Sequence, residues 1–236
     1  MSNVINSITL SNQLVQAKAL MASLTNADGS IMFKNLDRAV IVQNTLRSEI
    51  LLNNSSTSFQ VPVLQNSQFT GTNTTNTSNL LSLQDLQVVT DIGIFVAKPS
   101  NATDGGYQIF PYAPANVFSS ANTASSLIGA YSNGFLKFVN NQQVISPFWD
   151  LQKHYTVSRT QPASNADYTA SAINYISSID GSTDGFYPCQ PMWVFNGAGN
   201  VQVTLNLPTN LAAVETNSRI VIMWRGFLLQ NASQIK

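Results

Sequence analysis

Hydrophobic positions along the chain follow two different spacings. In residues 3–25 they recur every three or four residues, at Leu10, Leu14, Ala17, Met21 and Leu24. Because an α-helix completes one turn in about 3.6 residues, this spacing places the five side chains on one face of a helix. The segment therefore predicts one amphipathic N-terminal helix.

The ends of this helix are indicated by residue types that favour helix boundaries. Thr9 or Ser11 is available as the N-cap, and Gly29 follows the last apolar position as a stop. Residues 28–30 are expected to form a flexible hinge. Two interpretations stay open, because such a helix can pack on its own domain or dock on a neighbouring subunit or an inner layer.

From about Lys34 onward, the hydrophobic positions lie in short runs that are rich in β-branched and aromatic residues. Eleven runs are expected to be strands: 39–42, 49–52, 59–63, 86–89, 92–96, 135–139, 144–145, 154–157, 192–195, 201–205 and 219–224. Many short strands without regular helices between them are typical of a β-sandwich or a barrel. The expected fold class is therefore all-β.

Turn residues indicate how some of these strands connect. Asn133-Gly134 has the composition of a tight turn, and Asn140-Asn141 is expected to close a hairpin. Residues 196–200 are expected to join the runs on either side as another antiparallel pair. The Thr- and Asn-rich tract 70–79 has no apolar side chain to bury, so it is expected to be an exposed loop.

Neutral side chains supply most of the polar surface. Ser, Asn, Thr and Gln together account for 89 of 236 residues, whereas 9% of residues are charged and the formal net charge is zero. Without a basic cluster that displaces counterions from phosphates, no direct nucleic-acid binding is expected. No apolar run is long enough to cross a bilayer, and no signal peptide is expected at the start of the sequence.

Few residues offer catalytic or metal-binding chemistry. A zinc site built from Cys and His ligands is excluded, because the chain has one of each. A Cys189–His154 dyad is conceivable, but the prolines beside Cys189 favour a buried structural cysteine. Residues 180–185 resemble an oxygen-rich calcium loop without its downstream Glu, which favours a surface turn. We therefore expect no catalytic, cofactor-binding or metal-binding residue, no cofactor and no enzymatic activity.

The large aromatic residues support two interpretations. Strand positions expected to include inward-facing core residues are Trp193, Phe195, Ile220, Ile222 and Trp224. The other interpretation is a sugar-stacking platform formed by Trp149, Trp193, Trp224 and the tyrosines, with polar amides that suit hydroxyl groups. A carbohydrate-binding β-sandwich therefore stays as an alternative function.

The second half of the chain carries features in an order that resembles viral jelly-roll coat proteins. These features are residues 131–138, 144–150 and 154–162, followed by the closing strand 219–229. In general character the chain is similar to the major capsid proteins of tailless, icosahedral, membrane-containing bacteriophages of the double jelly-roll lineage. The resemblance covers about residues 86–230 and is one of pattern rather than of a diagnostic motif.

The resemblance implies one or two eight-stranded jelly rolls in each chain. We expect an N-terminal helical arm over residues 1–30, a first jelly roll over 31–128 and a second over 129–236. One heavily looped jelly roll is the alternative, because the eleven strand runs are fewer than two jelly rolls need.

The resemblance also implies a function and a set of partners. In that family, trimers form pseudo-hexameric capsomers, and an N-terminal helical segment faces the inner membrane or neighbouring capsomers. We therefore expect a structural virion protein that is made in the host cytoplasm and assembles, as a homotrimer, into an icosahedral phage shell. The expected partners are neighbouring capsomers, other virion proteins and an internal membrane reached by the arm. A minor virion or spike protein is a further alternative.

Overall fold

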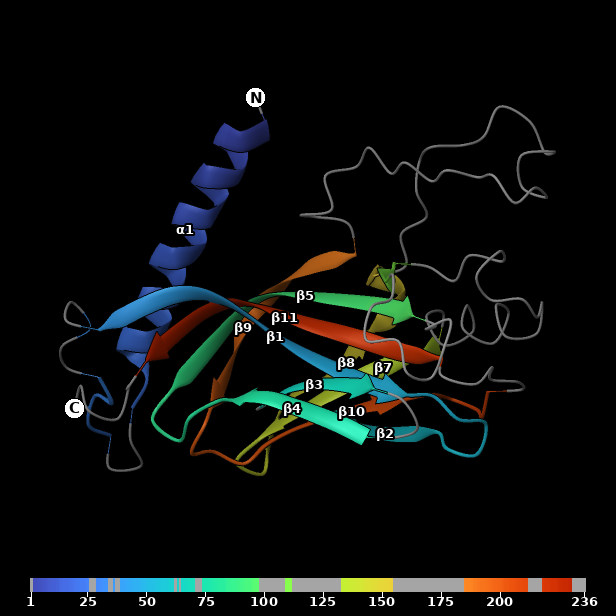
Figure 1. Cartoon of the computed structure of the whole chain (residues 1–236). Coiled ribbons are helices and arrows are strands. Elements are labelled where there is room, and N and C mark those ends of the chain that lie inside the picture. Colours follow the sequence, from blue (N-terminus) through green and yellow to red (C-terminus); the bar gives the residue numbers. More distant parts are fainter. Residues whose placement is uncertain are drawn as a thin grey trace.

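The computed structural model of the chain shows one helix followed by a body of antiparallel β-sheets (Figure 1). It describes residues 2–25, 29–33, 36, 39–61, 63, 65–70, 74–97, 109–111, 133–154, 185–211 and 218–230. Helix α1 spans Ser2–Ser23, and a 3₁₀ helix spans Leu151–His154. Within these residues, strands in two large sheets make up most of the regular structure, which confirms the all-β prediction.

The strands of the first half are β1 (Val40–Leu51), β2 (Ser58–Val61), β3 (Gln65–Thr70), β4 (Thr74–Leu80), β5 (Leu86–Ala97) and β6 (Ile109–Phe110). The strands of the second half are β7 (Phe135–Asn140), β8 (Gln143–Asp150), β9 (Phe186–Asn196), β10 (Val201–Asn206) and β11 (Arg219–Gln230).

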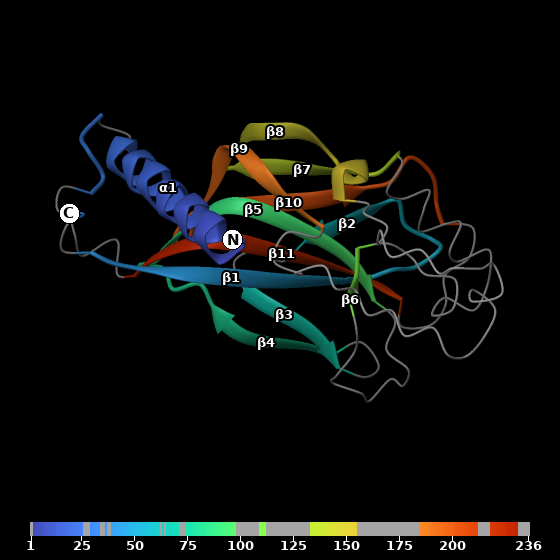
Figure 2. The same ribbon diagram turned by 90° about the horizontal axis from the view of Figure 1, so that it is seen from above.

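These strands form two facing sheets and a separate hairpin. The first sheet has the order β1-β11-β5-β6, with β9 also paired to β5, and the second has the order β2-β10-β7-β8. Among the described strands, β3 and β4 pair only with each other, and β3 lies near β1. Seen from above, β8 and β1 lie on opposite sides of the body (Figure 2).

The antiparallel pairs are nested along the chain. Strand β1 pairs with β11, β2 with β10, β5 with β9, and β7 with β8. Three of these pairs join strands on either side of the expected boundary between residues 128 and 129. The described strands of both halves therefore build one sandwich with a shared apolar interior.

Aromatic side chains from both sheets fill that interior. The Phe138 ring of β7 stacks on the Trp193 ring of β9 with centroids 4.6 Å apart, and Phe195 meets Trp224 edge to face at 5.4 Å. The indole N–H of Trp224 donates to the Ser48 hydroxyl at 2.9 Å, so its one polar group is satisfied in the core. The expected inward-facing residues Trp193, Phe195, Ile220, Ile222 and Trp224 are all buried, which confirms that prediction.

Several expected strands are parts of longer ones. Residues 40–42 and 49–51 of two runs belong to the single strand β1, and runs 86–89 and 92–96 belong to β5. Polar residues interrupt these runs in sequence, but β1 keeps an uninterrupted ladder with β11, and the ladder of β5 with β11 continues on both sides of a register shift at Thr90. Residue 154 of the run 154–157 lies in the 3₁₀ helix, and residues 155–157 lie outside the described part of the chain.

The prediction of an exposed loop over residues 70–79 is wrong. Strand β4 covers most of this tract and pairs with β3 in an antiparallel hairpin. Backbone hydrogen bonds hold a β-ladder whatever the side chains are, and threonine is one of the residues enriched in strands. The absence of apolar side chains was therefore not evidence against a strand here.

One of the two hairpin predictions is confirmed. Strands β7 and β8 pair across a turn at Asn141 and Gln142, which both have positive φ, as tight hairpin turns require. The pairing expected across residues 196–200 is wrong, because β9 pairs with β5 and β10 pairs with β2 and β7. This segment crosses between the sheets, and a Cβ at Gly197 would collide with the carbonyl oxygen of Ser82. At the expected turn Asn133-Gly134, positive φ is not found at Gly134.

The N-terminal helix is confirmed, but its expected N-cap is wrong. Helix α1 begins at Ser2, so Thr9 and Ser11 lie inside it. Helix α1 ends at Ser23, and Gly29 has positive φ in the turn that follows. A bridge between Thr25 and Ile31, with a 2.8 Å hydrogen bond from the Met32 N–H to the Leu24 carbonyl, closes this turn across the expected hinge.

Replacing Trp224 tests the packing between the two sheets. We expect Trp224→Ala to lower the free energy of unfolding by about 3–5 kcal/mol, because it removes a fully buried aromatic ring. Urea denaturation followed by circular dichroism measures this change. Trp224→Phe keeps a ring against Phe195 and loses the hydrogen bond to Ser48, so its cost should be clearly smaller. Equal midpoints for wild type and Trp224→Ala would contradict the assignment.

Candidate functional site

The outer face of the first sheet, on the side away from the sandwich interior, carries the candidate site. The C-terminal half of α1 covers one end of this face, where Ala17 and Met21 are fully buried against Leu86, Val88 and other sheet residues. Further side chains of this contact are Leu14, Leu20, Leu24, Ile41, Met192, Val194, Phe227 and Leu229. The interpretation that the helix packs on its own domain is therefore confirmed for this half of α1.

A row of polar and charged side chains crosses the same face beside the helix. The Gln13 amide of α1 donates to the Asp91 carboxylate at 3.1 Å, and the Thr90 hydroxyl donates to the same oxygen at 2.8 Å. Arg225 lies opposite Asp91 in the strand register, with 3.7 Å between its Nε and that carboxylate oxygen. This carboxylate therefore links α1 to the two central strands.

A second ion group lies further along the face. The buried Glu49 carboxylate of β1 contacts the Arg47 guanidinium at 2.6 Å and that of Arg219 on β11 at 3.0 Å. Glu49 and Arg219 are almost completely excluded from solvent. Buried charges of this kind are tolerated when they are paired, so this group is well suited to fix the register of β1 against β11.

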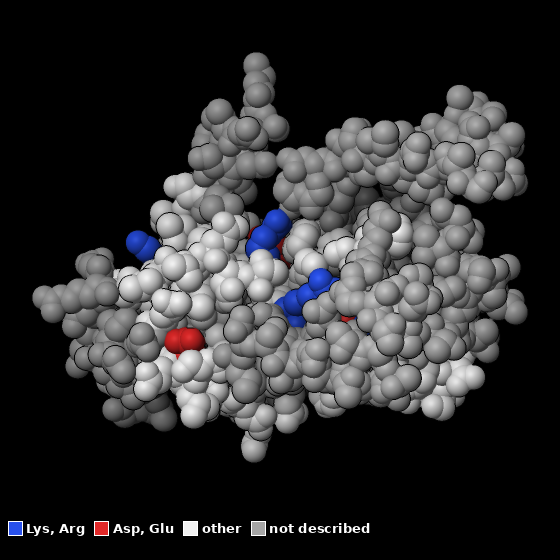
Figure 3. All heavy atoms as spheres, viewed as in Figure 1, with Lys and Arg blue, Asp and Glu red and all other residues white. Residues whose placement is uncertain are grey.

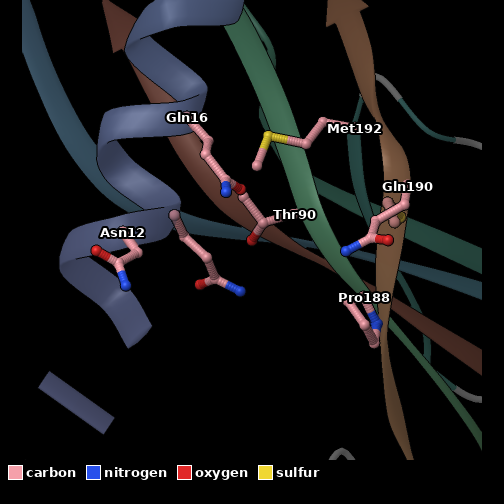
Figure 4. A pocket seen from close by; sticks show the side chains of 8 residues that line it. Asn12, Gln16, Thr90, Pro188, Gln190 and Met192 are labelled. Atoms are coloured by element: carbon pink, nitrogen blue, oxygen red, sulfur yellow. The ribbon is translucent and has the colours of Figure 1, made fainter. Parts of the chain in front are cut away.

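A pocket of about 260 Å³ lies between α1 and β9, next to Asp91. Figure 4 shows Asn12 and Gln16 extending from α1, Pro188 and Gln190 on β9, and Thr90 on β5 between them. Gln13, Cys189 and Met192 complete the lining. Asn12, Gln16 and Gln190 make no side-chain hydrogen bond to another described residue, so their amides can contact a ligand or water.

The chemistry of this pocket is hydrogen bonding rather than proton transfer. Each carboxamide offers two donors and one carbonyl acceptor, and none of them titrates. None of these carboxamide residues was predicted from the sequence as a site residue. The sequence feature that could have indicated this pocket is the presence of three carboxamides at positions 12, 13 and 16, which lie on one side of a helix.

His154 has a structural role. Its Nε2 accepts the indole N–H of Trp149 at 2.8 Å, and its Nδ1 faces the Gly185 carbonyl at 2.9 Å, so the ring is neutral with the proton on Nδ1. Burial, which removes solvent from the charged form, lowers the pKa of His154 to about 4. Both ring nitrogens are therefore occupied.

The conceivable Cys189–His154 dyad has no support from these contacts. Cys189 is buried in the sandwich interior, and burial, with the nearby Asp91 charge, raises the pKa of its thiol above the ordinary range. A neutral thiol and a histidine whose nitrogens are both engaged do not form an activated nucleophile. The interpretation of Cys189 as a buried structural residue is confirmed.

The other residues considered for binding are placed as follows. Trp149, Trp193 and Trp224 are all buried, so they do not form an exposed sugar-stacking platform. Residues 180–184 of the calcium-like loop lie outside the described part of the chain, and Gly185 has positive φ in a turn. Among the residues that the structure describes, no group of three or more His, Cys, Asp or Glu side chains comes together to hold a metal.

Uncharged groups dominate the described surface. Figure 3 shows a few separate Lys, Arg, Asp and Glu side chains on a face that is otherwise neutral where it is described. Large apolar residues are exposed on β8 at Val144, Ile145 and Phe148, and on α1 at Val15. No described helix is both long enough and apolar enough to span a bilayer.

The chain was compared with protein-family models and with curated proteins. No protein-family model matches the chain, and no curated protein matches it.

Shortening Met21 tests whether α1 belongs to the body. We expect Met21→Ala to lower the free energy of unfolding by about 2–5 kcal/mol, because the side chain is completely buried against the sheet. Val15→Ala on the exposed side of the same helix is the matched control and should change stability by less than about 0.5 kcal/mol. Thermal unfolding of both variants measures the difference, and equal midpoints would show that α1 is not part of the folded body.

Acid should destabilise the protein through His154. Its pKa is lowered from 6.5 to about 4 in the folded state, so the unfolded chain takes up the proton first as the pH falls. The contribution of the neutral His154 ring to the free energy of unfolding is therefore fully present above pH 6.5. It decreases by up to about 3 kcal/mol as the pH falls from 6.5 to about 4. His154→Gln keeps a donor and an acceptor without titrating. From pH 7.5 to pH 4.5, the urea midpoint should fall less in this variant than in the wild type. An equal fall in both proteins would contradict the role of His154 in acid destabilisation.

Proposed function

We propose that this protein is a structural virion protein that self-assembles into a phage shell, with one jelly roll in each chain. The observation that carries the proposal is the nested strand order, in which β1, β2, β5 and β7 pair with β11, β10, β9 and β8. Folding a long antiparallel ribbon over itself produces this order and distributes its eight strands over two sheets.

The distribution of the strands supports the jelly roll further. One sheet receives β1, β11, β5 and β9, and the other receives β2, β10, β7 and β8. The β3–β4 hairpin and the short β6 are then additions to an eight-stranded framework. This proposal takes up the single-jelly-roll alternative, because the nested pairs use strands from both of the segments expected to fold separately.

Jelly rolls occur both in viral capsid proteins and in lectins, so the fold alone does not distinguish these two functions. The features of the surface favour the first. The buried tryptophans remove the platform on which the carbohydrate-binding alternative relied. Among the described strands β8 pairs with β7 alone, its exposed apolar residues therefore lie at an edge of the described sheet, and from Gln143 to Trp149 it has no charged residue. Monomeric proteins usually protect sheet edges with charges, so an uncharged apolar edge favours association with other chains.

The neutral composition also supports assembly. Contacts built from carboxamides and hydroxyls avoid like-charge repulsion between identical subunits, and they avoid the desolvation of ion pairs. We propose a homotrimer as the assembly unit, with neighbouring capsomers and other virion proteins as partners. A pseudo-hexameric outline requires two jelly rolls in each subunit, so trimers of a single jelly roll should instead show three lobes.

Mass photometry and negative-stain electron microscopy of the purified protein test this proposal. We expect particles of three times the chain mass of 25.6 kDa, together with sheets or shell fragments at higher concentration. A strict monomer that is retained on a glycan array would contradict the proposal and favour the carbohydrate-binding alternative. Phe148→Asp, which places a charge on the β8 edge at a side chain that is 60% exposed, should reduce assembly without unfolding the monomer.

A further inference from the structure

The pocket between α1 and β9 has no role in the proposed self-assembly, and both of its walls are anchored in the folded body. On the helix side, Ala17 and Met21 are completely buried against the sheet. On the strand side, Cys189 and Trp193 of β9 are buried in the sandwich interior. The pocket is therefore preformed, as binding sites for small molecules usually are.

The Asp91 carboxylate orients two polar groups of the pocket lining. The Gln13 amide and the Thr90 hydroxyl both donate to its Oδ2, at 3.1 and 2.8 Å. A hydroxyl has one hydrogen, so the Thr90 oxygen can then act toward a ligand only as an acceptor. Gln13 keeps its carbonyl acceptor and one N–H. Because Asp91 is itself 8% exposed, these groups are held from inside the protein.

Three further carboxamides of the lining are available to a ligand. Asn12 and Gln16 of α1 and Gln190 of β9 are exposed and make no side-chain hydrogen bond to another described residue. Figure 4 shows Gln16 and Gln190 on opposite sides of Thr90. Each carboxamide offers two N–H donors and a carbonyl acceptor. A ligand between the two walls can therefore be held by hydrogen bonds from both.

The pocket lining carries no charged side chain. Apart from the carboxamides and Thr90, it consists of Pro188, Cys189 and Met192. Burial, and after it the Asp91 charge, raises the pKa of the Cys189 thiol, so this group is neutral as well. Pro188 and Met192 supply apolar contact area. This combination favours an uncharged ligand that has both hydrogen-bonding groups and an apolar face.

The volume and the hydrogen-bonding groups narrow the class of ligand. A volume of about 260 Å³ is below the range of about 300–1,000 Å³ that is typical of drug-sized ligands, so the pocket suits one small ring. A hydroxyl donates and accepts through the same oxygen, so neighbouring hydroxyls can donate to Thr90 and accept from Gln16 and Gln190. A carboxylate has no hydrogen to donate to Thr90, and an ammonium group has no acceptor for the amides.

We propose that this pocket binds a single uncharged sugar ring, either free or at the end of a glycan. The hydroxyls of the ring bond to Thr90 and the carboxamides, and the C–H groups of one ring face lie against Met192 and Pro188. The site is separate from the buried tryptophans and uses carboxamides in place of aromatic stacking. The inference does not depend on self-assembly, because the whole lining comes from one chain.

Saturation-transfer difference NMR of the full chain with D-glucose and D-galactose tests this site. We expect saturation of at least one of the two hexoses. Gln16→Ala and Gln190→Ala each remove an exposed carboxamide, so each should raise the Kd about threefold to tenfold and leave the thermal midpoint unchanged. Gln202→Ala is the matched control, because it removes an exposed carboxamide from β10 in the other sheet and should leave the Kd unchanged.

Charged and linked sugars test the class and the source of the ligand. D-glucuronate and D-galacturonate have a carboxylate in place of the CH₂OH group, so each should bind more weakly than its parent hexose. Maltose and lactose carry a glucose and a galactose ring at the non-reducing end. Saturation of that ring would identify a glycan end as a ligand, whereas saturation of the hexoses without the disaccharides would identify free sugar.

Several outcomes would overturn the inference. They are the absence of saturation of both hexoses, hexose binding that is unchanged in Gln16→Ala and Gln190→Ala, and a uronate that binds as tightly as its hexose. Saturation of acetamide without either hexose would show that the pocket takes an amide instead. Hexose binding by a strict monomer would support the inference and contradict the proposed self-assembly, so the two proposals can fail separately.

Discussion

The pairing of β11 with β5 is the contact on which the rest of the structure depends. Both strands lie inside the first sheet, with the aromatic interior on one side and α1 over part of the other. All residues of β5 are buried as a result. A strand buried on both faces accepts a charge only when it is paired, which explains why Asp91 of β5 lies opposite Arg225 of β11.

Burial of the outer face makes α1 part of the folded body. Leu86, Val88, Phe227 and Leu229 would face solvent without the helix, and a patch of this kind on a monomer is costly. The Gln13–Asp91 hydrogen bond then fixes the level at which the helix crosses the sheet. The same placement creates the amide-lined pocket beside β9 and directs Val15 away from the body.

The described surface is polar but mostly uncharged, because it has few charged side chains and many neutral amides. The charged side chains that the structure describes on the outer face are mostly engaged with one another, as in the Glu49 and Asp91 groups. His154 and Cys189, which offered the most direct route to catalysis, are held in the interior by hydrogen bonding and by burial. An uncharged surface of this kind can be buried in a contact without leaving a charge unpaired.

Local patterns in the sequence determined the helix, most strands and the aromatic core, because periodicity and residue type act over a few positions. Trp193, Phe195 and Trp224 were identified in this way. The tertiary structure alone decided the nested pairing, the position of β10 in the other sheet from β9, and the β3–β4 hairpin. It also decided the candidate site, since Gln13 and Asp91 meet across 78 residues. Such contacts depend on which distant strands pair with each other. The spacing of residues within a short segment does not contain this information.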